Sequence, residues 1–286
     1  MPLSADKLKY KLKDVKLVVS DIDGTLVTSD FRVSENLPVL ISKLRDKGVF
    51  FSIASQRVHS SICSLAEKLK ILIPVISLNG SLIQDVSGSI ILSKSILNPN
   101  IVDKAINLAE KNFVKISHSY NEKIIYTEDN SIFRDFFPIP DAEYLCIKNY
   151  DDYKDGILRI YLAGNEKNNI LKIKKQIKPF YNFSLKVDYF RSQSQRHLYK
   201  LEIHPAGITK RKALGILAKH MKLKKNEIAV IGDWYNDVEL FEFGAVNVTL
   251  KNGIMDLKRK ADYVSPYTND EGGVEDFLNI LLNSKD

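Results

Sequence analysis

Three nearly continuous apolar runs alternate with amphipathic helical patterns between residues 15 and 80. The runs are VKLVVS (15–20), VFFSIAS (49–55) and IPVISLNG (73–80), and the helical patterns between them are LPVLISKLRDKG (37–48) and VHSSICSLAEKLK (58–70). An apolar run without alternation is typical of a strand that is buried on both faces. Strands that alternate with helices form parallel sheets through right-handed crossovers. This part of the chain therefore predicts a doubly wound α/β sheet.

The stretch from residue 84 to residue 198 has a different character, with more aromatic residues and longer polar interruptions. Its strand patterns are KIIYT (123–127), GILRIYLAG (156–164) and FSLKVDYF (183–190), and its helical patterns are residues 100–112 and 169–178. The doubly wound pattern resumes with the helix KRKALGILAKHM (210–221) and the buried strand EIAVIGD (227–233). We therefore expect a Rossmann-like parallel core, residues 1–83 and 199–286, interrupted by an inserted α+β cap domain, residues 84–198.

The net charge of +7 raises the question of nucleic-acid binding. The lysines are dispersed, and local groups such as KIKKQIK (172–178) lie at helical spacing among apolar residues, as on solvated helix faces. We therefore expect no nucleic-acid partner. The charged beginning of the chain does not resemble a signal peptide, and no apolar run approaches the ~20 residues that span a bilayer, so we expect no membrane contact and a cytoplasmic location. The cysteines, Cys63 and Cys146, form no metal-type spacing.

Every apolar run of the predicted core ends in residues with polar side chains. Asp21 and Asp23 follow the first run, Ser55 and Asn79 end the next two, and Asp233 ends EIAVIGD. Ligands of open parallel sheets bind beyond the carboxyl ends of the strands. We therefore expect these five side chains to converge on one site.

Converging carboxylates without histidine suit a hard cation such as Mg²⁺, which prefers oxygen ligands. Such an ion would offset the repulsion between Asp21 and Asp23 and keep Asp21 ionised. An ionised carboxylate beside Mg²⁺ can attack phosphorus and form an aspartyl-phosphate. These residues therefore point to phosphoryl transfer.

Asp23 could protonate the leaving group and later activate water. Gly24 would let the backbone turn sharply after the strand. The transferring phosphoryl group needs hydrogen-bond donors and positive charge around it. The candidates are Thr25, Ser55 and Lys210, the last at the start of the helix before EIAVIGD.

Four motifs resemble, in order, the signatures of the haloacid dehalogenase-like hydrolase superfamily: DIDGTL (21–26), SIASQR (52–57), GITKRKAL (207–214) and GDWYNDVEL (232–240). The stretches SLNG (77–80), LEIHPAGITK (201–210) and ADYVSPYTNDEGGVEDFL (261–278) are similar to its Cof-type subfamily. The resemblance covers nearly the whole chain. It implies an α/β cap inserted after the third core strand.

The resemblance also implies a role for each matching residue. The catalytic residues would be Asp21, Asp23, Ser55 and Lys210. The metal site would comprise Asp21, Asp23, Asp233 and Asp237. Substrate contacts would come from Thr25, Arg57, Asn79, Gly80 and Asn236.

Two motifs depart from the family pattern, at three positions. Gln56 stands where the second motif usually has Gly, and Trp234 and Tyr235 are larger than the residues often found in the fourth motif. We expect Trp234 and Tyr235 to pack over the core rather than to stack on the substrate. We also expect His59, His118 and His220 to face solvent.

The resulting hypothesis is a Mg²⁺-dependent phosphatase that hydrolyses small phosphomonoesters, such as sugar phosphates, through an aspartyl-phosphate, as a monomer or homodimer. In the cap, Arg159, Arg191, Arg196 and His197 could contact a phosphorylated sugar. One alternative is a phosphomutase that resembles the phosphomannomutases. An alternative of another class is a non-catalytic metabolite-sensing or nucleic-acid-associated protein.

Overall fold

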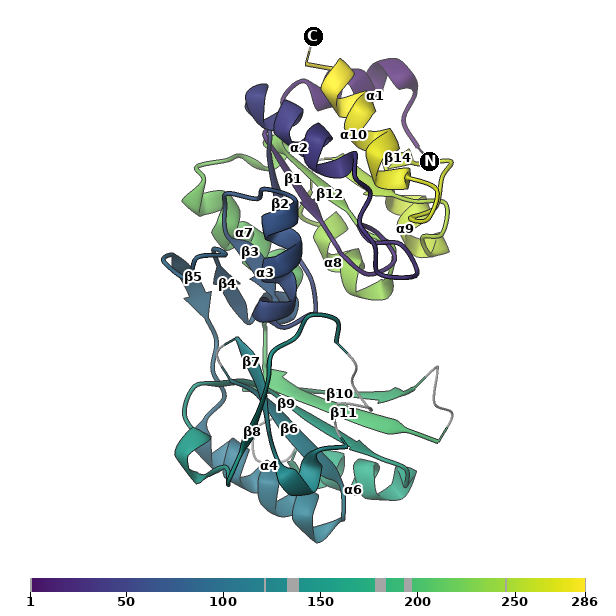
Figure 1. Ribbon diagram of the computed structural model, residues 1–286. Coiled ribbons are helices and arrows are strands. Elements are labelled where there is room, and N and C mark those ends of the chain that lie inside the picture. The colour runs from purple at the N-terminus through teal and green to yellow at the C-terminus, as the bar shows by residue number, and fades with distance from the viewer. Residues whose placement is uncertain are drawn as a thin grey trace. The chain divides into compact units, whose positions relative to one another are not determined.

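The computed structural model describes residues 2–120, 122–132, 139–177, 184–192, 197–244 and 246–285. They fold as two compact units (Figure 1). The first unit comprises residues 1–56, 62–93 and 209–286, and the second comprises residues 57–61 and 94–208. The second unit overlaps the stretch 84–198 expected for the inserted domain. Arg196 lies outside the described residues.

The first unit is built on a parallel sheet with the strand order β14-β13-β12-β1-β2. These strands are β1 (Leu17–Ser20), β2 (Phe50–Ile53), β12 (Ile228–Ile231), β13 (Val246–Thr249) and β14 (Tyr263–Val264). β1 lies between β12 and β2, with Ser20 opposite both Ile231 and Ile53. The ends of β1, β2 and β12 are therefore level with one another. This confirms the predicted doubly wound core.

Helices cover both faces of this sheet (Figure 1). Val18 of β1 belongs to the apolar cluster that includes residues of α1 (Ala5–Leu12), α2 (Leu37–Asp46), α3 (His59–Lys68) and α10 (Gly273–Asn283). Leu17 and Val19 point the other way, into a cluster with α7 (Lys210–His220), α8 (Val238–Phe241) and α9 (Met255–Lys260). Alternate residues of β1 are thus buried on opposite faces, which explains its unbroken apolar pattern.

The run at residues 73–80 forms only a short strand, β3 (Val75–Ser77), followed by the 3-10 helix η1 (Leu78–Gly80). β3 pairs antiparallel with β4 (Leu82–Gln84), beside which lies β5 (Ile91–Lys94). A single parallel bridge between Ala54 and Ile76 joins β3 to the end of β2. The third run therefore still ends beside the second, although it also belongs to a small antiparallel sheet.

The second unit is a mostly antiparallel sheet with the order β10-β11-β9-β6-β7-β8. Its strands are β6 (Lys115–Tyr120), β7 (Lys123–Thr127), β8 (Tyr144–Ile147), β9 (Ile157–Gly164), β10 (Leu185–Arg191) and β11 (Tyr199–Pro205). Among the described strand pairs of this sheet, only β7 and β8 are parallel, and the other pairs are antiparallel. Apolar residues of α4 (Pro99–Lys111) and α6 (Lys167–Ile177) pack with those of β6, β9 and β11. This agrees with the expected α+β character.

Two histidines contradict the expectation that they face solvent. His59 and His118 are both fully buried, whereas His220 is exposed as expected. The ring of His118 lies 4.5 Å from that of Tyr150, measured between centroids. Burial lowers the pKa of His118 to about 3, so this imidazole is neutral at physiological pH. His118 lies in the stretch KISHSY (115–120), whose few apolar residues do not predict a buried strand.

No helix among the described residues is long and apolar enough to cross a membrane.

Candidate active site

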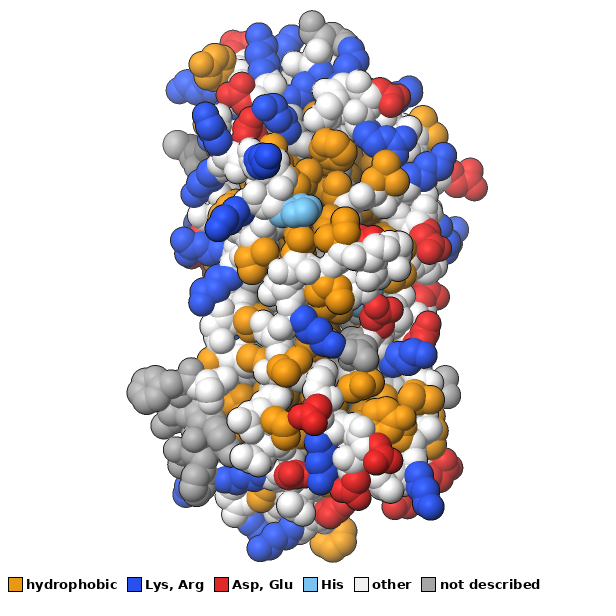
Figure 2. All heavy atoms as spheres, turned by 90° about the vertical axis from the view of Figure 1, so that its left-hand side faces the viewer, with side chains coloured by type: hydrophobic (Ala, Val, Ile, Leu, Met, Phe, Trp, Pro, Cys, Tyr) orange, Lys and Arg blue, Asp and Glu red, His pale blue; other side chains and the backbone are white. Residues whose placement is uncertain are grey.

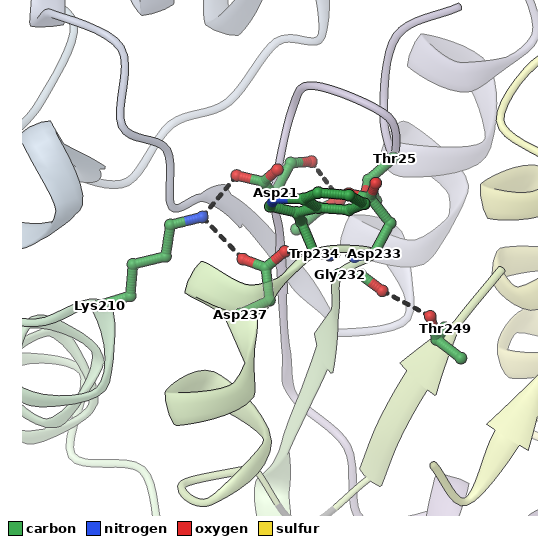
Figure 3. Close-up of polar contacts among 9 residues, drawn as sticks. Asp21, Thr25, Lys210, Gly232, Asp233, Trp234, Asp237 and Thr249 are labelled. Atoms are coloured by element: carbon green, nitrogen blue, oxygen red, sulfur yellow. Dashed lines mark hydrogen bonds and ion pairs between the residues drawn. The ribbon is translucent and has the colours of Figure 1, made fainter. Parts of the chain in front are cut away.

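Three aspartates converge beyond the carboxyl ends of β1 and β12 (Figure 3). The backbone N–H of Asp21 donates to the carbonyl of Ile231 at 3.0 Å, which fixes the two strand ends against each other. Asp21, Asp233 and Asp237 are 4%, 7% and 0% exposed, and each offers a carboxylate oxygen within 4.8 Å of the others. These oxygens form a buried, negatively charged cluster.

Lys210, the first residue of α7, projects its ammonium group into this cluster (Figure 3). Its Nζ donates to Oδ1 of Asp21 at 2.5 Å and to Oδ1 of Asp237 at 2.7 Å. Burial by itself would lower the pKa of Lys210, but the two carboxylates raise it above its ordinary value. The ammonium group therefore stays charged although it is only 2% exposed.

Asp237 joins Lys210 to the loop after β12. While its Oδ1 accepts from Lys210, its Oδ2 accepts from the backbone N–H groups of Asp233 and Trp234, each at 3.2 Å. Both oxygens of Asp237 thus already have protein donors. The carboxylates of Asp21 and Asp233 each keep one oxygen, Oδ2, that accepts no hydrogen bond from the described residues.

The turn after β1 contacts Asp233 closely. Thr25 Oγ1 donates to Asp233 Oδ1 at 2.8 Å. Gly24 has φ +76°, and a Cβ atom there would lie 2.3 Å from Asp233 Oδ2. Any side chain at position 24 would therefore collide with the carboxylate, which explains the glycine in DIDGTL.

The electrostatics of the cluster are unbalanced. Burial and the Asp237 carboxylate raise the pKa of Asp21 to about 8, although Lys210 opposes the shift. Burial also raises the pKa of Asp233 to about 6, and the carboxylates of Asp237 and Asp23 add to this effect. Without a further positive charge, the Asp21 carboxyl group is held partly in its neutral form at physiological pH.

Ser55 and Asn79, predicted from strand ends, are neighbours. Ser55 is fully buried, and its carbonyl accepts from the backbone N–H of Asn79 at 2.9 Å. Asn79 has φ 53°, and its buried Oδ1 has no hydrogen-bond partner. Gly80 follows with φ +107°, and a Cβ there would lie 2.7 Å from the carbonyl of Thr209, directly before Lys210. The turn at 78–80 therefore packs against the start of α7.

The other predicted residues lie at different distances from the cluster. Asp23 is partly buried and close enough to Asp233 to raise its pKa. Asn236 is partly exposed in the 3-10 helix η6 (Tyr235–Asp237). Arg57 is buried, but it belongs to the segment 57–61, which folds with the second unit. The functional roles of all three stay predictions.

Two residues that support the site were not predicted from the sequence. Thr249 Oγ1 donates to the carbonyl of Gly232, and Asn252 Nδ2 donates to the carbonyl of Gly24, both at 2.7 Å. They stabilise the backbone of the two loops that carry the aspartates. Thr249 ends β13 and Asn252 follows it, and this position at a strand end was the available signal, because β13 lies next to β12.

The expectation that Trp234 and Tyr235 pack over the core is wrong. Their side chains are 47% and 62% exposed. Residues 234 and 235 lie where the chain leaves β12 and enters η6, outside the apolar clusters on both faces of the sheet.

Replacing Gly80 by Ala should destabilise the first unit more than replacing Gly48 by Ala. Both glycines have positive φ, but a Cβ at position 48 meets no atom within 4 Å. Gly48→Ala should therefore cost only the left-handed strain, about 1–2 kcal/mol. Gly80→Ala should cost a further ~1–3 kcal/mol because the methyl group meets backbone at Thr209. Urea unfolding of both variants measures the difference, and equal losses would contradict the packing described here.

Comparison with known proteins agrees with this arrangement. The profile of the haloacid dehalogenase-like hydrolase family matches residues 18–278. Phosphatase YwpJ of Bacillus subtilis is 28% identical, over 94% of this chain and 100% of that protein. The 5-amino-6-(5-phospho-D-ribitylamino)uracil phosphatase YitU of the same organism is 27% identical, over 92% of this chain and 96% of that protein.

Solved structures show the same fold. A haloacid dehalogenase-like hydrolase from Bacteroides thetaiotaomicron superposes with a TM-score of 0.82 at 24% identity, covering 93% of this chain and 98% of that one. TM0651 from Thermotoga maritima superposes with a TM-score of 0.80 at 25% identity, covering 93% and 97%. The family match, the fold and the order of the motifs lead to one conclusion: this chain belongs to the haloacid dehalogenase-like hydrolases.

Proposed function

We propose that the protein hydrolyses small phosphomonoesters through an aspartyl-phosphate on Asp21, with Mg²⁺ as its cofactor. The observation that carries this proposal is the carboxylate of Asp21, which is held by Lys210 at 2.5 Å inside a buried acidic cluster. The names of the relatives YwpJ and YitU, both phosphatases, support the reaction type. The name of YitU also supports a small phosphorylated metabolite as the substrate class.

The donor set of the cluster fits Mg²⁺. Its ligand atoms are all carboxylate oxygens, which suit a hard cation. Asp21 and Asp233 would hold the ion, because each keeps an oxygen without a donor among the described residues. Asp237 would support the ion indirectly, since both of its oxygens already accept hydrogen bonds. The bound ion would supply positive charge to the phosphoryl group and keep the carboxylates ionised.

Asp21 would act as the nucleophile. One oxygen of its carboxylate forms a bond to phosphorus while the bond from phosphorus to the leaving oxygen breaks. Asp23 donates a proton to that leaving oxygen, so an alcohol departs. Water then attacks the phosphorus of the aspartyl-phosphate, Asp23 takes its proton, and inorganic phosphate leaves with the Asp21 carboxylate restored. Lys210 orients Asp21 and stabilises charge on the phosphoryl oxygens.

One face of the first unit shows how its positive charges are distributed. On the face of the first unit drawn in Figure 2, lysine and arginine side chains are scattered among acidic and apolar ones. Nucleic-acid sites instead gather positive charge into a continuous patch or stripe.

Asp21→Asn should abolish phosphate release from any phosphomonoester, because the amide keeps the size of the side chain but cannot attack phosphorus. Its thermal midpoint should stay near that of the native protein, because the amide oxygen can still accept a hydrogen bond from Lys210, which keeps its ion pair with Asp237. Asp152→Asn, at an exposed position of the second unit, is the matched control and should keep full activity. Substantial turnover by folded Asp21→Asn would exclude the covalent mechanism.

Mg²⁺ should raise the thermal midpoint more at high pH than at low pH. The folded-state pKa values of Asp21 and Asp233, about 8 and about 6, exceed the ordinary value of 3.8. The metal-free folded protein therefore binds more protons than the unfolded chain, so its stability falls as pH rises from about 4 to about 8. Mg²⁺ competes with those protons.

The shift in thermal midpoint produced by Mg²⁺ should accordingly be small near pH 5.5 and large near pH 8, when measured by scanning calorimetry. Asp233→Ala should reduce the shift at both pH values. A shift that is independent of pH in the native protein would argue against a cation at these carboxylates.

Asp23→Asn should impair the cleavage of alkyl phosphates more than that of nitrophenyl phosphate. An alkoxide needs a proton in order to leave, whereas nitrophenolate is stable without one, and general-acid help contributes about 10²–10⁴-fold. The comparison requires the first turnover in a rapid-quench experiment, because slow hydrolysis of the aspartyl-phosphate limits both substrates afterwards. Equal losses in that burst would assign Asp23 to metal positioning instead.

A further inference from the structure

Two large aromatic side chains stand exposed next to the acidic cluster. Trp234 and Tyr235 follow Asp233 directly and are 47% and 62% exposed. Their rings contact each other edge to face, with centroids 5.3 Å apart and planes at 77°. Figure 3 shows the Trp234 indole nearly edge-on in front of the carboxylates of Asp21 and Asp233. An exposed aromatic pair thus begins one residue after Asp233.

The backbone that carries this pair is fixed on both sides. The N–H of Trp234 donates to Asp237 Oδ2 at 3.2 Å, and its carbonyl accepts from the N–H of Asp237 at 3.0 Å. The carbonyl of Asp233 accepts from the N–H of Ile254 at 3.0 Å. Because the same carboxylate holds Lys210 and the backbone of Trp234, the main chain at position 234 is kept in place beside the cluster.

Exposed aromatic rings on a rigid loop are well suited to ligand binding. They offer a large apolar area with little conformational entropy to lose, and they prefer to contact other planar rings by offset stacking or by an edge. A saturated ring or an aliphatic chain can offer C–H groups to such rings, but it has no π system for offset stacking. The adjacent cluster would take the phosphate, so the pair would meet the part of the substrate beyond the ester oxygen.

We propose that Trp234 and Tyr235 determine substrate specificity by binding a planar, unsaturated ring in the leaving group of the phosphomonoester. The proposal rests on the proposed function for the position of the phosphate. It narrows the substrate class from phosphomonoesters in general to those whose alcohol carries such a ring.

The chain contains a single tryptophan, so the tryptophan component of its fluorescence reports on this position alone. The full-length protein with Mg²⁺ would be titrated with benzylphosphonate and, separately, with cyclohexylmethylphosphonate, whose carbon–phosphorus bonds are not hydrolysed. The two ligands have the same charge and differ in the planarity of the ring. Benzylphosphonate should change the Trp234 emission and bind about 2- to 12-fold more tightly, as expected for one aromatic pair.

Turnover provides the second measurement. The ratio of kcat/KM for benzyl phosphate to that for cyclohexylmethyl phosphate should exceed one in the native protein, mainly through KM, because both leaving groups are primary alcohols. Trp234→Ala should bring this ratio close to one, and Trp234→Phe should retain most of it. Tyr10→Ala, which removes a 77% exposed aromatic side chain on α1, is the control and should leave the ratio unchanged.

The outcomes separate this inference from the proposed function. Phosphate release with equal preference for both esters in the native protein and in Trp234→Ala would overturn the inference and leave the proposed function intact. A selective fluorescence response to benzylphosphonate in a protein that hydrolyses no ester would support the aromatic site and overturn the proposed function. An emission spectrum that neither phosphonate alters would overturn the inference even if a variant failed to fold.

Discussion

A buried ammonium group between two carboxylates holds the candidate site together. Lys210 contacts Asp21, which is 189 positions away in the chain, and Asp237, which is 27 positions away. These two ion pairs join the loop after β1, the start of α7 and the loop after β12. A buried charge that loses its partner typically costs about 3–5 kcal/mol. The three segments are therefore constrained to meet, although the whole second unit lies between the first two in sequence.

The same interaction leaves an excess of negative charge. Three buried carboxylates, Asp21, Asp233 and Asp237, face one ammonium group, so a fully ionised cluster would carry −3 + 1 = −2. Burial raises the pKa values of Asp21 and Asp233, and the neighbouring carboxylates raise them further. A divalent cation is the simplest group that removes it, because its charge matches the excess and its preferred ligands are oxygen atoms. The proposed cofactor thus follows from the charge count as well as from the residue types.

Much of this site could be predicted from the sequence, because the carboxyl ends of parallel strands meet at one edge of the sheet. Asp21, Ser55, Asn79 and Asp233 each end an apolar run, and this is enough to expect them together. Patterns of apolar residues do not reveal which oxygen meets which donor. Only the structure shows that both carboxylate oxygens of Asp237 accept hydrogen bonds, whereas Oδ2 of Asp233 accepts none from the described residues.

The errors also have physical causes. β6 carries the buried His118 although it has few apolar residues. This strand lies inside the sheet, because it pairs with β7 on one side and with β9 on the other. The exposure of Trp234 depends on the direction in which the chain leaves β12, and η6 sets that direction through the Asp237 carboxylate. Hydrophobicity alone predicts the opposite for a tryptophan. In both cases long-range contacts overrode the local pattern.

The most direct test of the account is to trap the phosphorylated enzyme. The native protein and Asp23→Asn would be mixed with Mg²⁺ and nitrophenyl phosphate, whose leaving group needs no proton, and quenched in acid after the first turnover of the native protein. They would then be reduced with borohydride, which converts an aspartyl-phosphate to homoserine, and mapped by peptide mass spectrometry. We expect homoserine at position 21, with more of it in Asp23→Asn because water is not activated there. Phosphate release without modification of Asp21 in either protein, or modification at another residue, would contradict the central claim.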